Sequence, residues 1–218
     1  MNVKSSNIQI PNQNLHHYPP DGVPMRFNTV LLDPPWSIQQ KGNLGASTHY
    51  NVMTLEEIKA LPINELTSDN AHVWLWITNA VVPHIPELMK AWGLTYRSIY
   101  TWCKPRLGLG QYLRNCTEQL ILCTKGKAAI QFRGQMNWGF MPVQDHSHKP
   151  EEVYEIIERC SPGPYLEMFA RQRHPGWYAW GNEVPSDIVI DDQPVPEYTE
   201  DAKNWCTKKQ KDCEVKNE

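Results

Sequence analysis

The stretch that most restricts the fold is VLLDPPW, residues 30–36, in which an apolar run meets an acid, two prolines and a tryptophan. The run from Thr29 to Leu32 is typical of a buried strand. Asp33 and Pro34 each precede a proline, which disfavours helical backbone, so the chain should leave the strand extended. Because proline has no backbone N–H, this strand end offers acceptors only, namely the Asp33 carboxylate and the Pro34 carbonyl.

Such an edge suits an amino group with two hydrogens to donate. The amine of an aromatic base is a poor nucleophile, because its lone pair is delocalised into the ring. Two acceptors held on its hydrogens would favour a pyramidal nitrogen and aim the lone pair at an electrophile, which is catalysis by placement and preorganised electrostatics. Trp36 offers a flat surface on which a base can stack, worth about 1–3 kcal/mol. The alternative is an ordinary turn, since Asp-Pro-Pro also occurs by chance.

Expected strands and helices alternate along the rest of the chain. This alternation predicts an open, mostly parallel α/β sheet with helices on both faces. Ligands on such sheets bind at the carboxyl ends of the strands, where Asp33 lies. The sequence predicts strands at 71–78, 95–103, 118–126, 165–170 and 176–183, and helices from the Thr54–Glu57 capping box, from Ile85 to Gly93 and from Lys149 to Ser161.

Composition indicates one domain. A chain of 218 residues can bury a sizeable core. We expect an irregular arm at 1–27, a single domain at 28–185 and an acidic, flexible tail at 186–218. Six cysteines without a C-x-x-C pair suggest neither a metal site nor a disulfide framework. No apolar run reaches membrane-spanning length, so a cytoplasmic protein without a membrane partner is expected.

Charge is distributed unevenly around a net value of -3. Residues 97–149 hold eight basic and two acidic side chains, whereas residues 183–218 hold five lysines and ten acids. This asymmetry is compatible with a basic face for a polyanion, although scattered solvated charges would give the same count. Lys104, Arg106 and Arg114, in the loop between two expected strands, are the candidates for contact with a nucleic-acid backbone.

Four segments occur in an order that resembles a known family: DPPW, LWIT, SHKPEEVYEIIERCSPGPYLEMFAR and WGNE, between Val30 and Glu183. The chain resembles the family of the catalytic subunit of eukaryotic mRNA adenine-N(6) methyltransferase, which also has short bacterial and phage members. The resemblance implies a Rossmann-like, S-adenosylmethionine-dependent methyltransferase sheet. It also implies a permuted motif order, because the catalytic motif precedes the cofactor strand.

The resemblance also assigns roles to residues. It implies that Asp33, Pro34, Pro35 and Trp36 form the catalytic loop, with Asp33 also beside the cofactor. Trp36, Tyr50 and Trp76 match positions near the target base. The cofactor positions are Lys149, Glu167, Arg171, Asn182 and Glu183, with Arg173 or His174 as one further contact. A glycine-rich cofactor loop is missing, as is usual in this family, and the glycines of GLGQYL (108–113) lie in the wrong context for one.

Together these features predict methyl transfer from S-adenosylmethionine to the exocyclic amino group of adenine in a nucleic acid. DNA is favoured over RNA by analogy with compact bacterial and phage members. A catalytically silent, nucleic-acid-binding subunit of a methyltransferase complex is a rival. A cytosine or protein-amide methyltransferase is disfavoured. Related motifs in those enzymes usually have Asn or Ser at the position of Asp33 and Tyr or Phe at the position of Trp36. A homodimer or an accessory subunit is left open.

Overall fold

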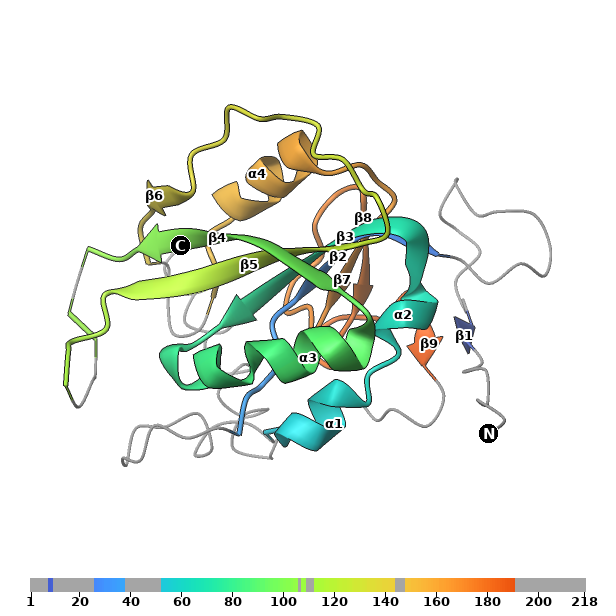
Figure 1. Cartoon of the computed structure of the whole chain (residues 1–218), viewed down its shortest axis with the longest axis horizontal. Coiled ribbons are helices and arrows are strands. Elements are labelled where there is room, and N and C mark those ends of the chain that lie inside the picture. Colours follow the sequence, from blue (N-terminus) through green and yellow to red (C-terminus); the bar gives the residue numbers. More distant parts are fainter. Residues whose placement is uncertain are drawn as a thin grey trace, which may run out of the picture.

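The computed structural model describes residues 8–9, 26–37, 52–105, 107–108, 112–143 and 148–190. Its centre is a seven-stranded sheet in the order β6-β4-β5-β3-β2-β7-β8 (Figure 1). The strands are β2 Phe27–Leu32, β3 Thr67–Ile77, β4 Thr95–Cys103, β5 Thr117–Lys125, β6 Trp138–Phe140, β7 Tyr165–Met168 and β8 Trp177–Trp180.

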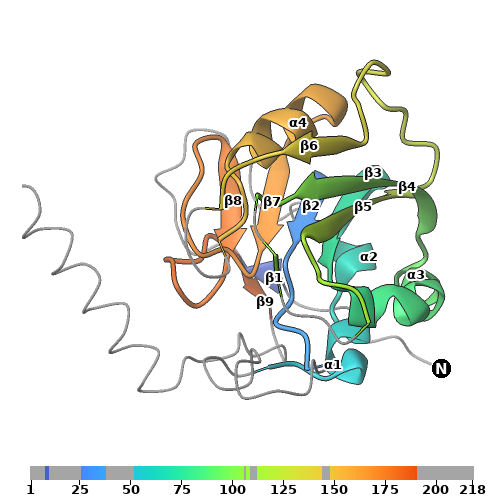
Figure 2. The same cartoon turned by 90° about the vertical axis from the view of Figure 1, so that its left-hand side faces the viewer.

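Strand direction brings distant segments to one edge of the sheet. Every neighbouring pair is parallel except the two pairs made by β5. The carboxyl ends of six strands and the start of β5 therefore lie at the same edge, which we call the carboxyl edge. Figure 2 looks onto the left-hand side of Figure 1, toward which β3 and β4 point. The predicted mostly parallel α/β sheet is confirmed, and it places the end of β2 at the ligand-binding edge of such folds.

Helices cover both faces of the sheet (Figure 1). The helices α1 Leu55–Lys59, α2 Ile63–Leu66 and α3 Ile85–Trp92 lie on one face, and α4 Glu152–Cys160 lies on the other. The predicted capping box at Thr54 is present, with its side chain accepting from the backbone N–H of Glu57. Helix α3 ends as predicted at Gly93, whose φ of 65° closes the helix in the left-handed region that glycine favours.

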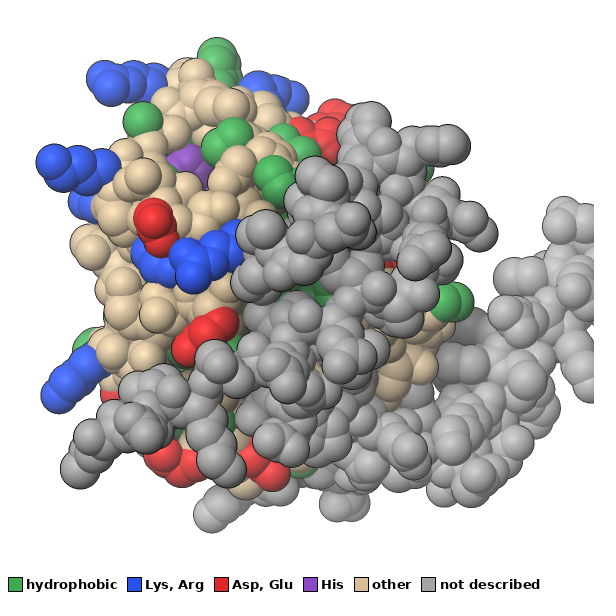
Figure 3. All heavy atoms as spheres, turned by 90° about the vertical axis from the view of Figure 1, so that its right-hand side faces the viewer, with side chains coloured by type: hydrophobic (Ala, Val, Ile, Leu, Met, Phe, Trp, Pro, Cys, Tyr) green, Lys and Arg blue, Asp and Glu red, His purple; other side chains and the backbone are tan. Residues whose placement is uncertain are grey.

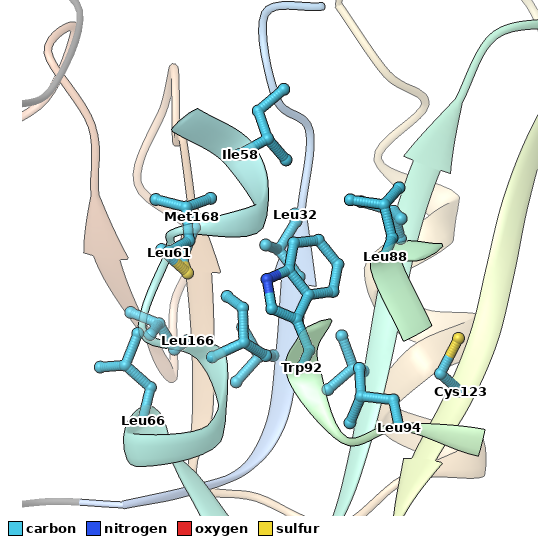
Figure 4. Packing of buried hydrophobic residues seen from close by; sticks show 14 of the residues in the cluster. Leu32, Ile58, Leu61, Leu66, Leu88, Trp92, Leu94, Cys123, Leu166 and Met168 are labelled. Carbon is cyan, nitrogen blue, oxygen red and sulfur yellow. The ribbon is translucent and has the colours of Figure 1, made fainter. Parts of the chain in front are cut away.

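The core is divided by the sheet into two clusters. On the side of α1 to α3, Trp92 is 1% exposed and packs among aliphatic side chains that include Leu61, Leu166 and Met168 (Figure 4). On the side of α4, a second cluster includes three buried tryptophans of the central strands, Trp74, Trp76 and Trp102. Most of the nine tryptophans thus build the core, which holds the strand ends rigidly.

Two features at the ends of the domain differ from expectation. Ile8 and Gln9 form strand β1, which pairs with β9, Val189–Ile190. Asp187 and Ile188 are each 1% exposed, so the packed unit continues beyond the expected boundary at residue 185. The reason is visible in the contacts of Asp187, whose carboxylate accepts from the backbone N–H of Ala179 and from Arg173. The rest of the expected tail lies outside the described residues.

The opposite edge of the sheet carries mixed charges. Figure 3 shows the right-hand side of Figure 1, where basic and acidic side chains are interspersed on the described surface. Arg26 at this edge pairs with Asp69 at 3.0 Å. Within the described residues, no helix has the length and apolar character needed to cross a membrane.

Candidate active site

The Asp-Pro-Pro-Trp segment forms a loop tied to three neighbouring parts of the chain. The backbone N–H of Asp33 donates to the carbonyl of Met168, at the end of β7, over 3.4 Å. The Pro35 carbonyl accepts from the N–H of Met53 at 2.7 Å. The indole N–H of Trp36 donates to the carbonyl of Trp76, at the end of β3, over 3.2 Å. The loop is therefore held in place across the carboxyl edge of β2, β3 and β7.

Two acceptors on this loop meet no hydrogen-bond donor among the described residues. One oxygen of Asp33 is bound to Lys149, and no donor among the described residues reaches the other oxygen. The carbonyl of Pro34 likewise accepts no hydrogen bond from the described part of the chain. The Asp33 side chain keeps 20% of its surface exposed. Within the described residues, the second oxygen of Asp33 and the carbonyl of Pro34 are thus acceptors without a donor.

A chain of alternating charges runs from Asp33 along the carboxyl edge. The ammonium of Lys149 lies 2.7 Å from Asp33 and 3.5 Å from Glu118, the second residue of β5. Glu118 also binds Lys104, which follows β4. The two ammonium groups lie over tryptophan rings, Lys149 at 5.3 Å from the centroid of Trp76 and Lys104 at 4.6 Å from that of Trp102. Each charge therefore has an opposite charge as its neighbour.

This pairing keeps both central groups charged. Burial acts to lower the pKa of Lys149, but the charges of Asp33 and Glu118 outweigh it, so this pKa is raised. Burial acts to raise the pKa of Glu118, but Lys149 and Lys104 outweigh it, so this pKa is lowered. At neutral pH Lys149 therefore remains a cation held between two carboxylates.

A second cluster lies at the end of β7. The hydroxyl of Tyr154, on α4, donates to a carboxylate oxygen of Glu167 at 2.8 Å. The ring of His174 stacks on Tyr154 with centroids 4.0 Å apart and planes 4° from parallel. Burial raises the pKa of Glu167 to about 7, with Asp33 adding to this effect while the Tyr154 hydrogen bond and Lys149 oppose it. Glu167 is thus a partly buried carboxyl whose pKa is raised toward neutrality.

The turns after β7 and β8 approach each other closely. Phe169 has a φ of 65° at the end of β7. Beyond β8, a Cβ added to Gly181 would lie 2.2 Å from the carbonyl oxygen of Ala170, so only glycine fits there. Beside this contact, Nε of Arg171 lies 3.4 Å from Oε1 of Glu183. Asn182, which stands between Gly181 and Glu183 in the turn after β8, is exposed.

Arg173 and His174 are separated by the structure. Arg173 donates to both carboxylate oxygens of Asp187 at 2.8 Å and to the carbonyl of Pro185. These bonds tie Arg173 to the segment that leads into β9. His174, by contrast, lies against Tyr154 and so near Glu167. Of the two residues between which the sequence left a choice, His174 is the one that contacts Tyr154.

Two predicted substrate contacts do not fit their surroundings. Trp76 is 2% exposed, so it leaves almost no surface on which a base can stack. It supports the site instead, because its carbonyl accepts from Trp36 and its ring lies under Lys149. Lys104 is bound to Glu118 rather than free for a phosphate. Arg114 is exposed, while Tyr50 and Arg106 lie outside the described residues.

The sequence reading missed Glu118 and Tyr154. Glu118 stands at the start of β5, and only the antiparallel pairing of β5 with β4 brings it beside Lys104 and Lys149. Tyr154 lies in the amphipathic α4, where its position is that of a core residue. The one sequence signal for a functional role of Glu118 was the position of an acid at the border of an apolar strand. No sequence signal set Tyr154 apart from a core residue.

Comparisons with known proteins show the family of the chain. A family model described as MT-A70 matches residues 27–183. An N(6)-adenosine-methyltransferase MT-A70-like protein of Drosophila melanogaster is 29% identical over 185 residues, 79% of this chain and 29% of that protein. The human N(6)-adenine-specific methyltransferase METTL4 is 29% identical over 182 residues, 72% of this chain and 37% of that protein.

A shorter relative matches over most of its own length. The Type II methyltransferase M.MunI of Mycoplasma sp is 26% identical over 188 residues, 75% of this chain and 80% of that protein. By contrast, the chain spans 24–30% of the length of the first eukaryotic relatives. The MT-A70 match begins with the first residue of β2 and ends beside Arg171 at Glu183, so it includes the whole described site. The chain therefore belongs to the MT-A70 family.

Proposed function

We propose that this protein transfers a methyl group from S-adenosylmethionine to the exocyclic amino group of adenine in a nucleic acid. The observation that carries the proposal is a pair of acceptors at the carboxyl edge that no described residue satisfies, the second oxygen of Asp33 and the carbonyl of Pro34. Membership of the MT-A70 family and the names of its relatives support the same chemistry. We favour DNA, by analogy with the compact Type II methyltransferase, most of whose length aligns with this chain.

The chain's own residues act on the amine by placement. The second oxygen of Asp33 and the carbonyl of Pro34 each accept one hydrogen of the amine, which favours a pyramidal nitrogen with a directed lone pair. Lys149 holds the other Asp33 oxygen and so limits rotation of the carboxylate. Trp36, anchored through its indole N–H, supplies a wall for the base. No covalent intermediate on the protein is required.

The residues along the carboxyl edge fit S-adenosylmethionine, which when bound supplies an electrophilic methyl group. An ammonium has three hydrogens; that of Lys149 donates one to Asp33 and lies 3.5 Å from Glu118, so it can also meet the carboxylate of the cofactor. Glu167, Asn182 and Glu183 provide acceptors of the kind that ribose hydroxyls bind. Arg171 and His174 complete the set of residues that we assign to the cofactor.

Nucleoside analysis tests the proposal. The protein is incubated with the donor labelled in its methyl group and with separate pools of DNA and RNA, and the digested nucleosides are separated by mass. We expect labelled N6-methyladenine from the DNA pool. Label in cytosine or in protein would contradict the proposal, and so would a protein that binds no donor in calorimetry. Label found in adenine of the RNA pool alone would support methyl transfer to adenine and show that the substrate is RNA rather than DNA.

A further inference from the structure

A tyrosine of α4 joins two of the residues that we assign to the cofactor. Tyr154 is 6% exposed and is the third residue of α4. Its hydroxyl donates to Oε2 of Glu167, on β7, at 2.8 Å. Its ring stacks on His174, in the turn between β7 and β8, with centroids 4.0 Å apart. One buried side chain thus contacts an acid and an imidazole from two different segments.

The hydroxyl of Tyr154 has one direction in which to donate. Burial is the main cause that raises the pKa of Tyr154, whereas a hydrogen bond with the side chain of Gln172 acts to lower it. A bond that lowers the pKa of a phenol is one donated to its oxygen. Because a hydroxyl carries a single hydrogen, that hydrogen goes to Glu167. The other carboxylate oxygen, Oε1, accepts no hydrogen bond from the described residues.

The ring of Tyr154 is fixed independently of its hydroxyl. Trp177, on β8, meets it edge-on with centroids 5.2 Å apart and planes at 81°. The indole N–H of Trp177 donates in turn to Glu158 of α4 at 2.8 Å. Aromatic pairs favour such stacked and edge-to-face arrangements. The change Tyr154→Phe therefore keeps the ring in its packed position and removes the hydrogen bond to Glu167.

The groups around Glu167 compete over its charge. Burial has the largest influence and raises the pKa of Glu167, the Tyr154 hydrogen bond lowers it, Asp33 raises it and Lys149 lowers it, and the result is about 7. Of the two influences that favour the ionised carboxylate, the Tyr154 hydrogen bond is thus the larger. The charge state of Glu167 near neutral pH depends on this one hydroxyl.

The remaining neighbours of Glu167 are uncharged or lie behind Tyr154. Leu31 of β2 and Ala179 of β8 stand opposite Glu167 in the sheet. His174 lies against the Tyr154 ring, and its Nε2 is 3.6 Å from an oxygen of Glu158. The titratable groups that face the carboxyl from the elements packed around it are therefore Tyr154, Lys149 and Asp33, with His174 next to Tyr154.

We propose that Tyr154 is a positioning residue, which holds Glu167 as an oriented, ionised acceptor for the ribose hydroxyls of S-adenosylmethionine. This inference rests on the proposed function, because it takes Glu167 to be a cofactor contact. Hydrogen bonds to an ionised acceptor are about twice as strong as those between neutral groups. Cofactor affinity should therefore depend on whether Glu167 is ionised, and Tyr154 acts by favouring that state.

The test measures the dissociation constant for S-adenosylmethionine by calorimetry at pH 6, 7 and 8.5, for the intact protein and for Tyr154→Phe. The ratio of the two constants at each pH cancels any titration of the cofactor itself. We expect a ratio of about 10 at pH 6 and about 5 at pH 7, as for one lost hydrogen bond to an ionised carboxylate. At pH 8.5, where Glu167 is ionised in both proteins, the ratio should be below about 2.

Tyr165→Phe is the matched control, because the Tyr165 hydroxyl donates to the carbonyl of Ser161 at 2.9 Å from the same strand as Glu167. It should leave the dissociation constant unchanged at every pH. In a Glu167→Gln background, the further change Tyr154→Phe should give a ratio that does not vary with pH. Thermal melting checks that each variant folds.

The outcomes separate this inference from the proposed function. Equal affinities of Tyr154→Phe and the intact protein at pH 6 would overturn the inference. A loss of affinity that is the same at all three pH values would also overturn it, because a purely structural role predicts that result. An intact protein that binds no S-adenosylmethionine at any pH would refute the proposed function itself, and the inference with it.

Discussion

At the scale of single residues, the site depends on how Asp33 is shared. One of its oxygens is bound to Lys149, which Glu118 also neutralises, while the other meets no donor among the residues that the structure describes. The side chains of Lys149, Asp33 and Glu118 are only 20–25% exposed, so losing one partner would leave an uncompensated charge in a partly buried position. Lys149 therefore contributes both to the fold and to the orientation of the catalytic carboxylate.

Glu167 gives the protein a pH-dependent stability. Its pKa rises from 4.5 to about 7 on folding, chiefly through burial. Between these values the folded chain binds more protons than the unfolded chain, so the contribution of Glu167 to the free energy of unfolding falls as pH rises. Glu167→Gln removes this contribution. Denaturant titrations should show the stability of the variant, relative to the intact protein, increasing from about pH 5 to about pH 8.

Glu118→Gln serves as the control for that experiment. The pKa of Glu118 is lowered, so this carboxyl is ionised in both states over most of the same pH range. The cost of Glu118→Gln should therefore stay nearly constant with pH. A relative stability of Glu167→Gln that did not change with pH would show that Glu167 is not the partly buried acid with a raised pKa described above.

At the scale of elements, the sequence predicted those with strong local signals. Helix α3 is bounded by Ile85 and Gly93 as expected, and β4 matches the predicted range 95–103. Strand β3 begins four residues earlier than predicted, because its polar start is held by pairing with β2 at Thr67 and with β5 at Ala71. Short elements such as β6 were missed, since three residues carry too little pattern and depend on a neighbouring strand.

Substitutions of two glycines test how the ends of the helices and strands are packed. Gly93 has a φ of 65° with no atom within 4 Å of an added Cβ, so Gly93→Ala should cost only the backbone strain, about 1–2 kcal/mol. In Gly181→Ala the new Cβ would also meet the carbonyl of Ala170 at 2.2 Å, so the loss should be larger. Denaturant unfolding measures both. Equal costs, or a larger cost at Gly93, would contradict the close approach of the turns after β7 and β8.

At the scale of the whole molecule, the fold explains why scattered motifs act together. Strand β5, which runs antiparallel to the other strands of the seven-stranded sheet, lets Glu118 join the carboxyl ends of its neighbours at one edge. From the sequence, the α/β class, the place of Asp33 and the MT-A70 resemblance were predictable, because each rests on local pattern or motif order. The pairing of Lys104 with Glu118 and the burial of Trp76 were not, because both depend on contacts across strands.

The central claim is that Asp33 holds the amine while other residues hold the cofactor, and Asp33→Asn tests it most directly. This change keeps the size of the side chain and removes its charge, and thermal melting checks that the variant folds. Single-turnover methyl transfer to adenine should fall about 100- to 1,000-fold, with the dissociation constant for S-adenosylmethionine in calorimetry changed by less than about threefold. A transfer rate close to that of the intact protein, with cofactor bound normally, would contradict the account.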